Sequence, residues 1–392
     1  MKLFVLGNIN AGKSYVIEKL RKIFPEYDVL KIDEWRIAHC DGSIEKEEAV
    51  WEEFPRAVLQ KENVIVEFCG GGKVAQNIVN CLVDNSCIVL KVCADTETCV
   101  ARMKGKNFAA VPYPQYPGAG SIEDTIRVIG TQMQNGSVEE LWREKAVCIF
   151  SIDSGEQLDT LPLRQYEKIC KLKKLYTSQK CEMFLFGSAA RQSMTVHSDV
   201  DVFLLSARSA EEHCAFLKNY FESCSVMGNE VVIREDGVLV ELDCITDVAE
   251  AELFYSTGQI TDAKGSVLIG GEKLISTLEA YAVKKCDFKK ELQFTTERLW
   301  YYVLSLPPLI GKEDEYKYYF HNNIIIHEYV RLKAFLHGVF EHSYLPRYAK
   351  QFLSNEEWQD LVYNFGDDRN RHYQTVRTLS EKLLSEVKEK WR

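Results

Sequence analysis

Four fixed residue types near the N-terminus have the spacing of a triphosphate-binding loop. The segment Gly7–Ser14, GNINAGKS, fits the pattern G-x-x-x-x-G-K-[ST] and lies between an apolar run and an amphipathic one. Its glycines let backbone N–H groups face one phosphate, Lys13 adds positive charge, and the Ser14 hydroxyl can hold Mg²⁺. An ordinary glycine turn before a helix is the alternative. We predict that these residues bind ATP or another nucleoside triphosphate: Gly7, Asn8, Asn10, Ala11, Gly12, Lys13, Ser14 and Tyr15.

Charged residues at the ends of the next two predicted strands could serve the reacting groups. Asp33 directly follows the second strand, and open α/β sheets bind ligands at the carboxyl ends of their strands. Asp33 could take the proton of an acceptor hydroxyl, and Arg36 could bind an anionic acceptor. Glu67, at the end of the third strand, is an alternative metal or substrate ligand. A strand end followed by a helix cap would also explain Asp33 and Arg36, so both interpretations stay open.

A basic run that begins at Arg102 follows the fourth strand and its helix. It suits a lid over a transferring phosphoryl group, although a solvated charge run has the same composition. With the phosphate loop and the Asp-x-x-Arg after the second strand, it resembles the small P-loop kinases (the nucleoside, shikimate and gluconate kinase-like group) over about residues 1–155. The resemblance implies catalytic roles for Lys13 and Asp33. It also implies substrate or lid contacts for Arg36 and Arg102.

A second group of polar residues lies near the middle of the chain. Gly187-Ser188 ends one apolar run, Asp199-Val-Asp201 begins another, and Asp243 lies in a third. Residues two apart on a strand point to the same face, about 6–7 Å apart, so Asp199 and Asp201 can converge on Mg²⁺ ions. Carboxylates against apolar strands are costly to bury unpaired, which disfavours a mere Asp-rich turn. Two metal ions and three carboxylates suit nucleotidyl transfer.

This second group resembles the signature of the DNA polymerase β-type nucleotidyltransferase superfamily. That signature is Gly-Ser, a gap of about ten residues, Asp-x-Asp and a third Asp on a later strand. Five residues match it by position: Gly187, Ser188, Asp199, Asp201 and Asp243. The resemblance implies that the aspartates are catalytic metal ligands and that Gly187 and Ser188 bind the nucleotide. Glu241, on the same strand face as Asp243, is a candidate general base. The chain beyond 245 is similar to aminoglycoside-type small-molecule nucleotidyltransferases, which carry a C-terminal helical domain.

Three segments must position these residues, and together they predict an α/β plus α+β architecture. Residues 1–160 alternate apolar strands with helices, which predicts a P-loop domain with a parallel sheet. Residues 161–275 predict a helix and then a small mixed sheet, with a hairpin turn at Asp236-Gly237. Residues 276–392 predict a helical, substrate-binding domain with a candidate break at Asn322-Asn323.

Two segments have unusual compositions. Ala109–Gly120 holds three prolines and two glycines, which predicts a loop. Aromatic residues crowd the C-terminal helices, where they could stack on a base or a sugar, although core packing is the favoured interpretation. They are Trp300, Tyr301, Tyr302, Tyr316, Tyr318, Tyr319 and Phe320.

Composition restricts the partners and the compartment. The net charge is −10 and none of the three segments is strongly basic, which disfavours a long nucleic acid as substrate without excluding a local basic groove. The 13 cysteines, an odd number without close pairs, predict reduced thiols in the cytoplasm. No apolar run approaches the roughly 20 residues of a membrane span, and the N-terminus lacks the features of a signal peptide.

We interpret the sequence as a bifunctional enzyme that transfers a nucleoside monophosphate to a hydroxyl of a small molecule and carries a P-loop domain with kinase activity. One alternative is the processing of RNA or tRNA ends by a kinase joined to a nucleotidyltransferase. Another is a P-loop domain that senses nucleotide and gates the nucleotidylation of a partner protein.

Overall fold

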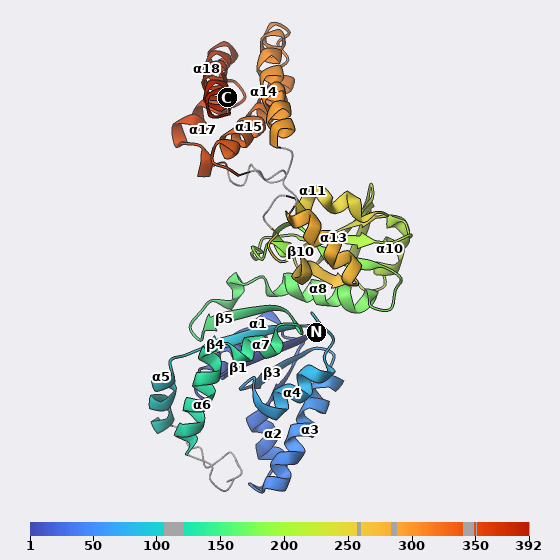
Figure 1. Cartoon of the computed structure of the whole chain (residues 1–392), viewed down its shortest axis with the longest axis vertical. Coiled ribbons are helices and arrows are strands. Elements are labelled where there is room, and N and C mark those ends of the chain that lie inside the picture. Colours follow the sequence, from blue (N-terminus) through green and yellow to red (C-terminus); the bar gives the residue numbers. More distant parts are fainter. Residues whose placement is uncertain (106–120, 257–259, 284–287, 340–348, 350, 392) are drawn as a thin grey trace. The chain divides into compact units, whose positions relative to one another are not determined.

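The computed structural model describes residues 1–105, 121–256, 260–283, 288–339, 349 and 351–391 (Figure 1). They fall into two compact units. Unit 1 comprises Met1–Thr246 and Gly265–Gly270, and unit 2 comprises Asp247–Lys264 and Gly271–Arg392. Unit 1 contains two β-sheets, and unit 2 is built from helices. The three-domain division at 160–161 and 275–276 stays a prediction. The loop predicted at Ala109–Gly120 lies outside the described residues.

Five parallel strands form the first sheet of unit 1, in the order β2-β3-β1-β4-β5. They are β1 (Lys2–Gly7), β2 (Asp28–Lys31), β3 (Val64–Phe68), β4 (Cys87–Cys93) and β5 (Ala146–Asp153). Strands β2 and β3 lie on one side of β1 and β4 and β5 on the other, so the strand order reverses beside β1. Open α/β sheets bind ligands at such a reversal. The predicted parallel α/β sheet is confirmed.

Helices enclose the first sheet, because its strands alternate buried side chains between the two faces. Phe4 packs on one face, with its ring centroid 4.5 Å from that of Trp142. Helix α1 packs on β1 and buries Val16, Ile17 and Leu20, whose spacing fits one helix stripe. The helices of this region are α1 (Lys13–Ile23), α2 (Ile32–His39), α3 (Ile44–Gln60), α4 (Gly72–Cys81), α5 (Thr96–Ala101), α6 (Ile122–Gln134) and α7 (Ser137–Trp142).

The connection after β5 packs against helix α1, which follows the predicted phosphate loop Gly7–Ser14 (the phosphate loop below). Strand β5 extends to Asp153. Lys19 of α1 then donates hydrogen bonds to the carbonyl oxygens of Gly155 and Glu156. A Cβ atom added to Gly12 would lie only 2.6 Å from Cβ of Ser154. The phosphate loop is therefore packed against the chain that leads to the second sheet.

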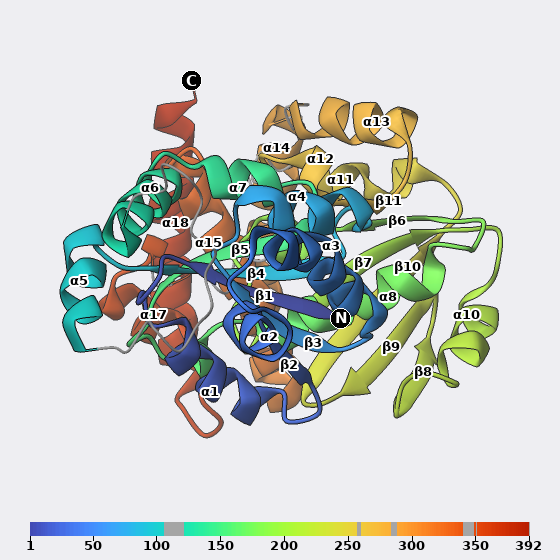
Figure 2. The same ribbon diagram turned by 90° about the horizontal axis from the view of Figure 1, so that it is seen from below.

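The second sheet of unit 1 is mixed, in the order β11-β6-β7-β10-β9-β8, as Figure 2 shows for β8, β9 and β10. Its strands are β6 (Glu182–Leu185), β7 (Val200–Leu205), β8 (Ser223–Met227), β9 (Glu230–Glu235), β10 (Val238–Ile245) and β11 (Val267–Ile269). The predicted hairpin is confirmed: Asp236 and Gly237 have φ of 51° and 76°, as a two-residue turn of this kind requires. Sequence reasoning missed β8 and β11.

Helix α8 (Leu163–Tyr176) contacts strands of both sheets within unit 1. Toward the first sheet, the hydroxyl of Tyr27 donates to Glu167 at 2.8 Å, and the ring centroids of Phe150 and Tyr166 are 5.7 Å apart. Toward the second sheet, the buried Lys168 bonds Glu235 at 2.7 Å and the turn residue Asp236 at 2.6 Å. The helix therefore belongs to the packing of both sheets.

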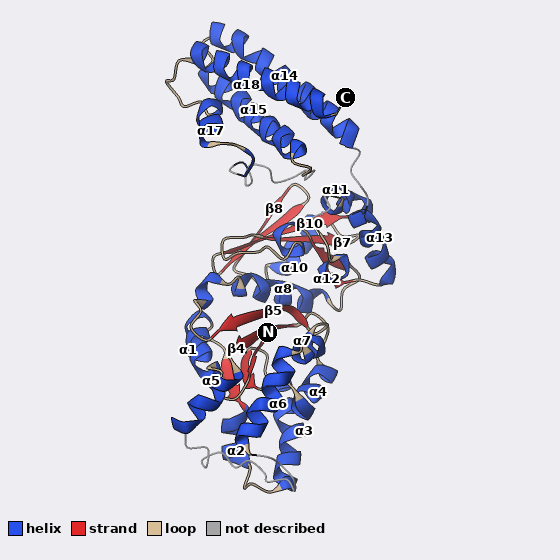
Figure 3. Cartoon of the chain, turned by 60° about the vertical axis from the view of Figure 1, so that its left-hand side comes forward, coloured by secondary structure: helices blue, strands red, loops and turns tan. Residues whose placement is uncertain are grey.

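Unit 2 contains helices in its described part, as the secondary-structure colouring of Figure 3 shows. Its longest helices, α14, α15 and α18, share one apolar core. The main helices are α13 (Glu272–Val283), α14 (Phe288–Gly311), α15 (Glu315–Leu336), α17 (Asn355–Leu361) and α18 (Arg369–Lys390). The predicted break at Asn322-Asn323 is wrong, because α15 is continuous there and the buried Asn322 amide donates to the Leu361 carbonyl at 2.9 Å.

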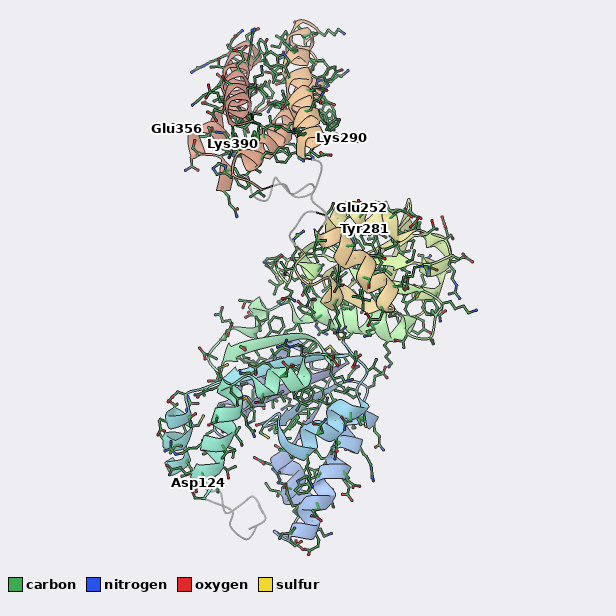
Figure 4. The ribbon with its side chains drawn as sticks, in the orientation of Figure 1. Asp124, Glu252, Tyr281, Lys290, Glu356 and Lys390 are labelled. Atoms are coloured by element: carbon green, nitrogen blue, oxygen red, sulfur yellow. The ribbon has the colours of Figure 1, made fainter. Side chains whose placement is uncertain are left out.

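The surface of unit 2 exposes both aromatic and charged side chains. Tyr318 is buried, as expected for core packing, whereas Tyr301 and Tyr316 are 66% and 75% exposed. Lys290 on α14 and Lys390 on α18, labelled in Figure 4, are also exposed. Among the described residues, no helix combines the length and the apolar character that a membrane crossing requires.

Candidate functional site

The phosphate loop joins β1 to α1 with the backbone conformation that its glycines permit. Gly12 has φ of 103°, in the left-handed region, and precedes the first residue of α1. The ammonium group of Lys13 donates to the carbonyl oxygens of Gly7 and Asn8, at 3.1 and 2.8 Å. Burial lowers the pKa of Lys13, while Glu67 is the largest influence in the opposite direction. An anion at the start of α1 would favour the charged form of Lys13.

The remaining residues predicted for the loop have different surroundings. Asn8 is buried and its amide donates to the Ile126 carbonyl at 2.9 Å, and Ala11 is buried. The amide of Asn10 donates to the Cys99 carbonyl, and Arg102 donates to the Asn10 carbonyl at 3.0 Å. Arg102, predicted for the lid, therefore touches the phosphate loop itself. The Tyr15 ring is 58% exposed on α1, with the Lys19 ammonium 4.8 Å from its centroid.

A cavity of about 420 Å³ lies beside the phosphate loop, where β1, β2 and β3 end. Asp33, Arg36 and Glu67, which sequence reasoning singled out, all line it together with Lys13 and Ser14. The hydroxyl of Ser14 is 3.3 Å from Oε1 of Glu67. Burial raises the pKa of Glu67, and Lys13 and Lys31 oppose that shift. The arrangement brings an ammonium group, a hydroxyl and two carboxylates to one cavity.

The guanidinium of Arg36 is engaged by carboxylates of the protein. Its Nε and Nη2 donate to the two oxygens of Glu47, at 3.0 and 2.7 Å, and its Nη1 donates to Asp33 at 3.2 Å. Glu47 lies on α3 and is only 4% exposed. In this geometry Glu47 and Asp33 hold the guanidinium, so Arg36 also supports Asp33. Its predicted role as a ligand of an anionic acceptor stays a prediction. Sequence reasoning missed Glu47, which looks like any surface glutamate of an amphipathic helix.

Other groups of the cavity could contact an acceptor. Helix α4 begins at Gly72, and its N-cap Gly71 has no side chain to satisfy the first N–H groups. Lys73 follows, with its ammonium 4.4 Å above the ring of Trp51. All four residues line the cavity. Free N–H groups at a helix start and a nearby lysine favour oxygen-rich or negatively charged groups.

The second candidate site starts at the tight turn after β6. Gly187 has φ of 59° and begins the short helix α9 (Gly187–Ala190). A Cβ atom there would lie 1.8 Å from Oδ2 of Asp201, so only glycine fits. The backbone N–H of Ser188 bonds the Asp201 carboxylate, and the buried Ser188 hydroxyl has no hydrogen-bond partner. An unpaired buried hydroxyl is costly unless a ligand satisfies it.

Three carboxylates converge next to this turn and form the carboxylate cluster: Asp199, Asp201 and Glu241. One oxygen of each lies within 4.8 Å of the others. Strands β7 and β10 are parallel, and their register pairs Asp201 with Glu241. Asp243, predicted as the third ligand, pairs instead with Phe203, two residues further along, and is not part of this cluster. The third carboxylate is therefore Glu241, which sequence reasoning had considered as a general base.

The electrostatics of the carboxylate cluster fit divalent cations. Asp201 is only 3% exposed, and burial, then Asp199 and Glu241, raise its pKa to about 7. Burial, and secondarily Asp199, also raises the pKa of Glu241. Like charges held this close disfavour ionisation, and a metal ion reverses that balance. Carboxylate oxygens are the ligands that Mg²⁺ prefers, so the donor set suits this ion.

The substitution Asp201→Asn is expected to stabilise the metal-free protein clearly more at pH 8 than at pH 5. The folded-state pKa of Asp201 is about 7, against about 3.9 in an unfolded chain. The folded state thus binds more protons in this window, and its stability falls as the pH rises from about 4 through 7. The neutral amide removes a cost of about 4 kcal/mol at pH 8 and about 1.5 kcal/mol at pH 5. Thermal unfolding in EDTA at both pH values measures it, and equal gains at pH 5 and 8 would contradict the assignment.

The substitution Gly187→Ala is expected to slow any reaction at the carboxylate cluster by about a hundredfold, since a misplacement of about 1 Å costs that much. The new methyl group would displace the Asp201 carboxylate. Gly228→Ala is the matched control, because Gly228 has a similar φ of 63° and nothing within 4 Å of the added atom. The reaction rates of both variants, compared with their melting temperatures, separate displacement of the carboxylate from backbone strain. Equal losses in both would refute the predicted clash.

Comparisons with known proteins bear on the second sheet. The family model "Nucleotidyltransferase domain" matches residues 163–264. Solved structures similar to the chain include a nucleotidyltransferase-like protein from Exiguobacterium sibiricum 255-15, with 12% identity over 55% of this chain and 72% of that one and a TM-score of 0.31. Two others are shikimate kinases, from Acinetobacter baumannii, in complex with shikimate (15% identity, 46% and 95% covered, TM-score 0.29), and from Aquifex aeolicus VF5 (16%, 45% and 96%, TM-score 0.27).

A search of curated proteins found no match. The family match spans Gly187, Ser188 and the whole carboxylate cluster, together with helix α8 and most of the second sheet. Residues 163–264 therefore carry a nucleotidyltransferase domain.

Proposed function

We propose that the chain is a bifunctional transferase, which moves a nucleoside monophosphate from a triphosphate to a hydroxyl of a small molecule at the carboxylate cluster. The observation that carries this proposal is the convergence of Asp199, Asp201 and Glu241 beside an unpaired Ser188 hydroxyl, inside the matched nucleotidyltransferase domain. The reaction forms a bond from the acceptor oxygen to the α-phosphorus and releases pyrophosphate.

Each group of this site has a proposed role in that transfer. The three carboxylates would hold Mg²⁺, which would supply a lower pKa for the attacking hydroxyl and positive charge beside the triphosphate. The Ser188 hydroxyl and the N–H groups at the start of α9 bind the triphosphate oxygens. The glycine at 187 allows Asp201 to approach this turn closely. We assign the third ligand to Glu241 in place of Asp243 because of the strand register.

At the phosphate loop we propose phosphoryl transfer from ATP to a hydroxyl of a small molecule. Lys13 would hold the outer phosphates and Ser14, with Glu67 beside it, the magnesium ion of ATP. Asp33, oriented by Arg36, would accept the proton of the acceptor. A cavity of about 420 Å³ has the size of ordinary small-molecule pockets, which favours a small acceptor over an RNA chain.

The chemistry of the cysteines supports a cytoplasmic location. The cysteines in the described residues are free thiols. Free thiols persist where the surroundings are reducing, as in the cytoplasm.

The test is mass spectrometry of reactions that contain ATP, Mg²⁺ and a panel of hydroxyl compounds, including nucleosides and aminoglycosides. Wild type is compared with Asp199→Ala and Lys13→Ala. We expect an acceptor that gains AMP only when Asp199 is present and one that gains phosphate only when Lys13 is present. Modification of RNA ends or of an added protein, with every small molecule unmodified, would reject the proposed acceptor class.

A further inference from the structure

The first residue of the carboxylate cluster comes from a loop and not from a strand. Asp199 precedes β7, at the end of the connection from α9. Within that connection, the Ser198 backbone N–H donates to the Thr195 carbonyl and the Thr195 N–H donates to the Ser198 hydroxyl, both at 3.0 Å. His197 is exposed. A short loop of this kind needs an outside support if its last carboxylate is to keep one direction.

Gln165 of α8 provides that support. Its amide nitrogen donates to the Val196 carbonyl at 2.8 Å and lies 3.4 Å from the Ser198 carbonyl. These two carbonyls belong to the residues on either side of His197, and Ser198 directly precedes Asp199. Among the described residues, the hydrogen bonds that tie 196–198 to another element come from this amide alone. The amide nitrogen of Gln165 is thereby directed at the loop.

Packing alone does not explain a glutamine at this position. Gln165 is 3% exposed, and its neighbours on α8 bury apolar side chains such as Leu163 and Ile169. Burying an amide costs desolvation free energy, and its hydrogen bonds do little more than offset that cost. Methionine would fill a similar volume without it. The glutamine is therefore better explained by the hydrogen bonds that it donates to the loop than by its packing.

We propose that Gln165 is a positioning residue for nucleotidyl transfer, which aims the Asp199 carboxylate at the metal site by holding the two carbonyls before it. This inference rests on the proposed function of the carboxylate cluster. Groups that orient metal ligands typically change metal affinity by about 10–100-fold when they are removed. The expected defect is therefore weaker metal binding, and not only less folded protein.

The first measurement is Mn²⁺ binding, followed by electron paramagnetic resonance with α,β-methylene-ATP present. It is made in the Lys13→Ala background, so that the phosphate loop does not hold a second metal–nucleotide complex. Gln165→Met keeps the volume and removes the donors, and we expect it to weaken Mn²⁺ binding at the cluster about tenfold or more. The Mg²⁺ concentration for half-maximal pyrophosphate release should rise by a similar factor, with excess Mg²⁺ restoring part of the rate.

Asn322→Leu is the matched control, because it also removes a buried amide that donates to a backbone carbonyl, but in unit 2. It should lower the melting temperature and leave Mn²⁺ affinity unchanged. If Gln165→Met does not fold, Gln165→Asn keeps the donors on a side chain one methylene shorter and should weaken Mn²⁺ binding as well.

Unchanged Mn²⁺ affinity in a folded Gln165 variant would overturn the inference. A wild type that binds Mn²⁺ through Asp199 but releases no pyrophosphate would instead reject the proposed reaction, and the binding comparison would still decide the role of Gln165.

Discussion

Pyrophosphate release is expected to fall at least about a thousandfold when Asp199 and Asp201 are both replaced by alanine. The two residues supply two of the three carboxylates within 4.8 Å of one another, and Asp201 is the most buried of them. Bound metal ions contribute several kcal/mol to such a transfer, and each 1.36 kcal/mol is a factor of ten in rate. A coupled pyrophosphate assay with saturating acceptor measures the change. ATP affinity at the phosphate loop should be unchanged, since that loop follows β1 of the first sheet, whereas both aspartates lie beside the second sheet.

Single substitutions on β10 test the assignment of the third carboxylate. Glu241 pairs with Asp201 in the strand register, whereas Asp243 pairs with Phe203. We expect Glu241→Gln to lose most of the pyrophosphate release and Asp243→Asn to keep most of it. The reverse result would restore Asp243 as the ligand. A double aspartate variant with wild-type pyrophosphate release would show that the second sheet has been misinterpreted.

Lys13→Ala should reduce phosphoryl transfer by about a hundredfold to a thousandfold. Its ammonium now bonds the carbonyl oxygens of Gly7 and Asn8, and the phosphates of ATP would replace those contacts. Losing one preorganised charge at a reacting phosphate costs about 3–4 kcal/mol. The transfer of labelled γ-phosphate to the acceptor gives the rate, and isothermal titration gives the ATP affinity.

Lys22→Ala is the control for that change, because Lys22 lies on the same helix in an exposed position at its far end. Lys22→Ala should leave both the rate of phosphoryl transfer and the ATP affinity unchanged. Nucleotidyl transfer by Lys13→Ala should stay within a few-fold of wild type. Loss of both activities together would argue against two separate sites.

Sequence patterns predicted the parts of the fold and of the two sites that depend on residues close together in the chain. Lys13 and Ser14 follow from the spacing of one loop, and Asp199 and Asp201 share a direction because they are two residues apart near one strand. The choice between Glu241 and Asp243 could not be predicted. Both lie on the same face of β10, and only the register with β7, about forty residues away in the chain, decides between them.

The other omissions also depend on contacts between distant segments. Glu47 reaches Arg36 across the turn between α2 and α3, and Gln165 meets the loop at 196–198 from a different helix. Neither has a local signal, because glutamate and glutamine are ordinary residues of a helix surface. Strand β8 was missed because its sequence, SCSVM, is an edge strand without a buried apolar face.

Because helix α8 packs against both sheets of unit 1, the stability of the two proposed sites should be linked. At its start, Arg164 bonds Glu26 and the Ile23 carbonyl at the end of α1, while the next residue, Gln165, bonds the loop before Asp199. A gene split between residues 160 and 161 would separate surfaces that bury one another. A ligand that stabilises the first sheet by mass action should also protect the second from unfolding. A mutation that weakens this helix should therefore reduce both proposed activities together, because it lowers the amount of folded protein that carries either site.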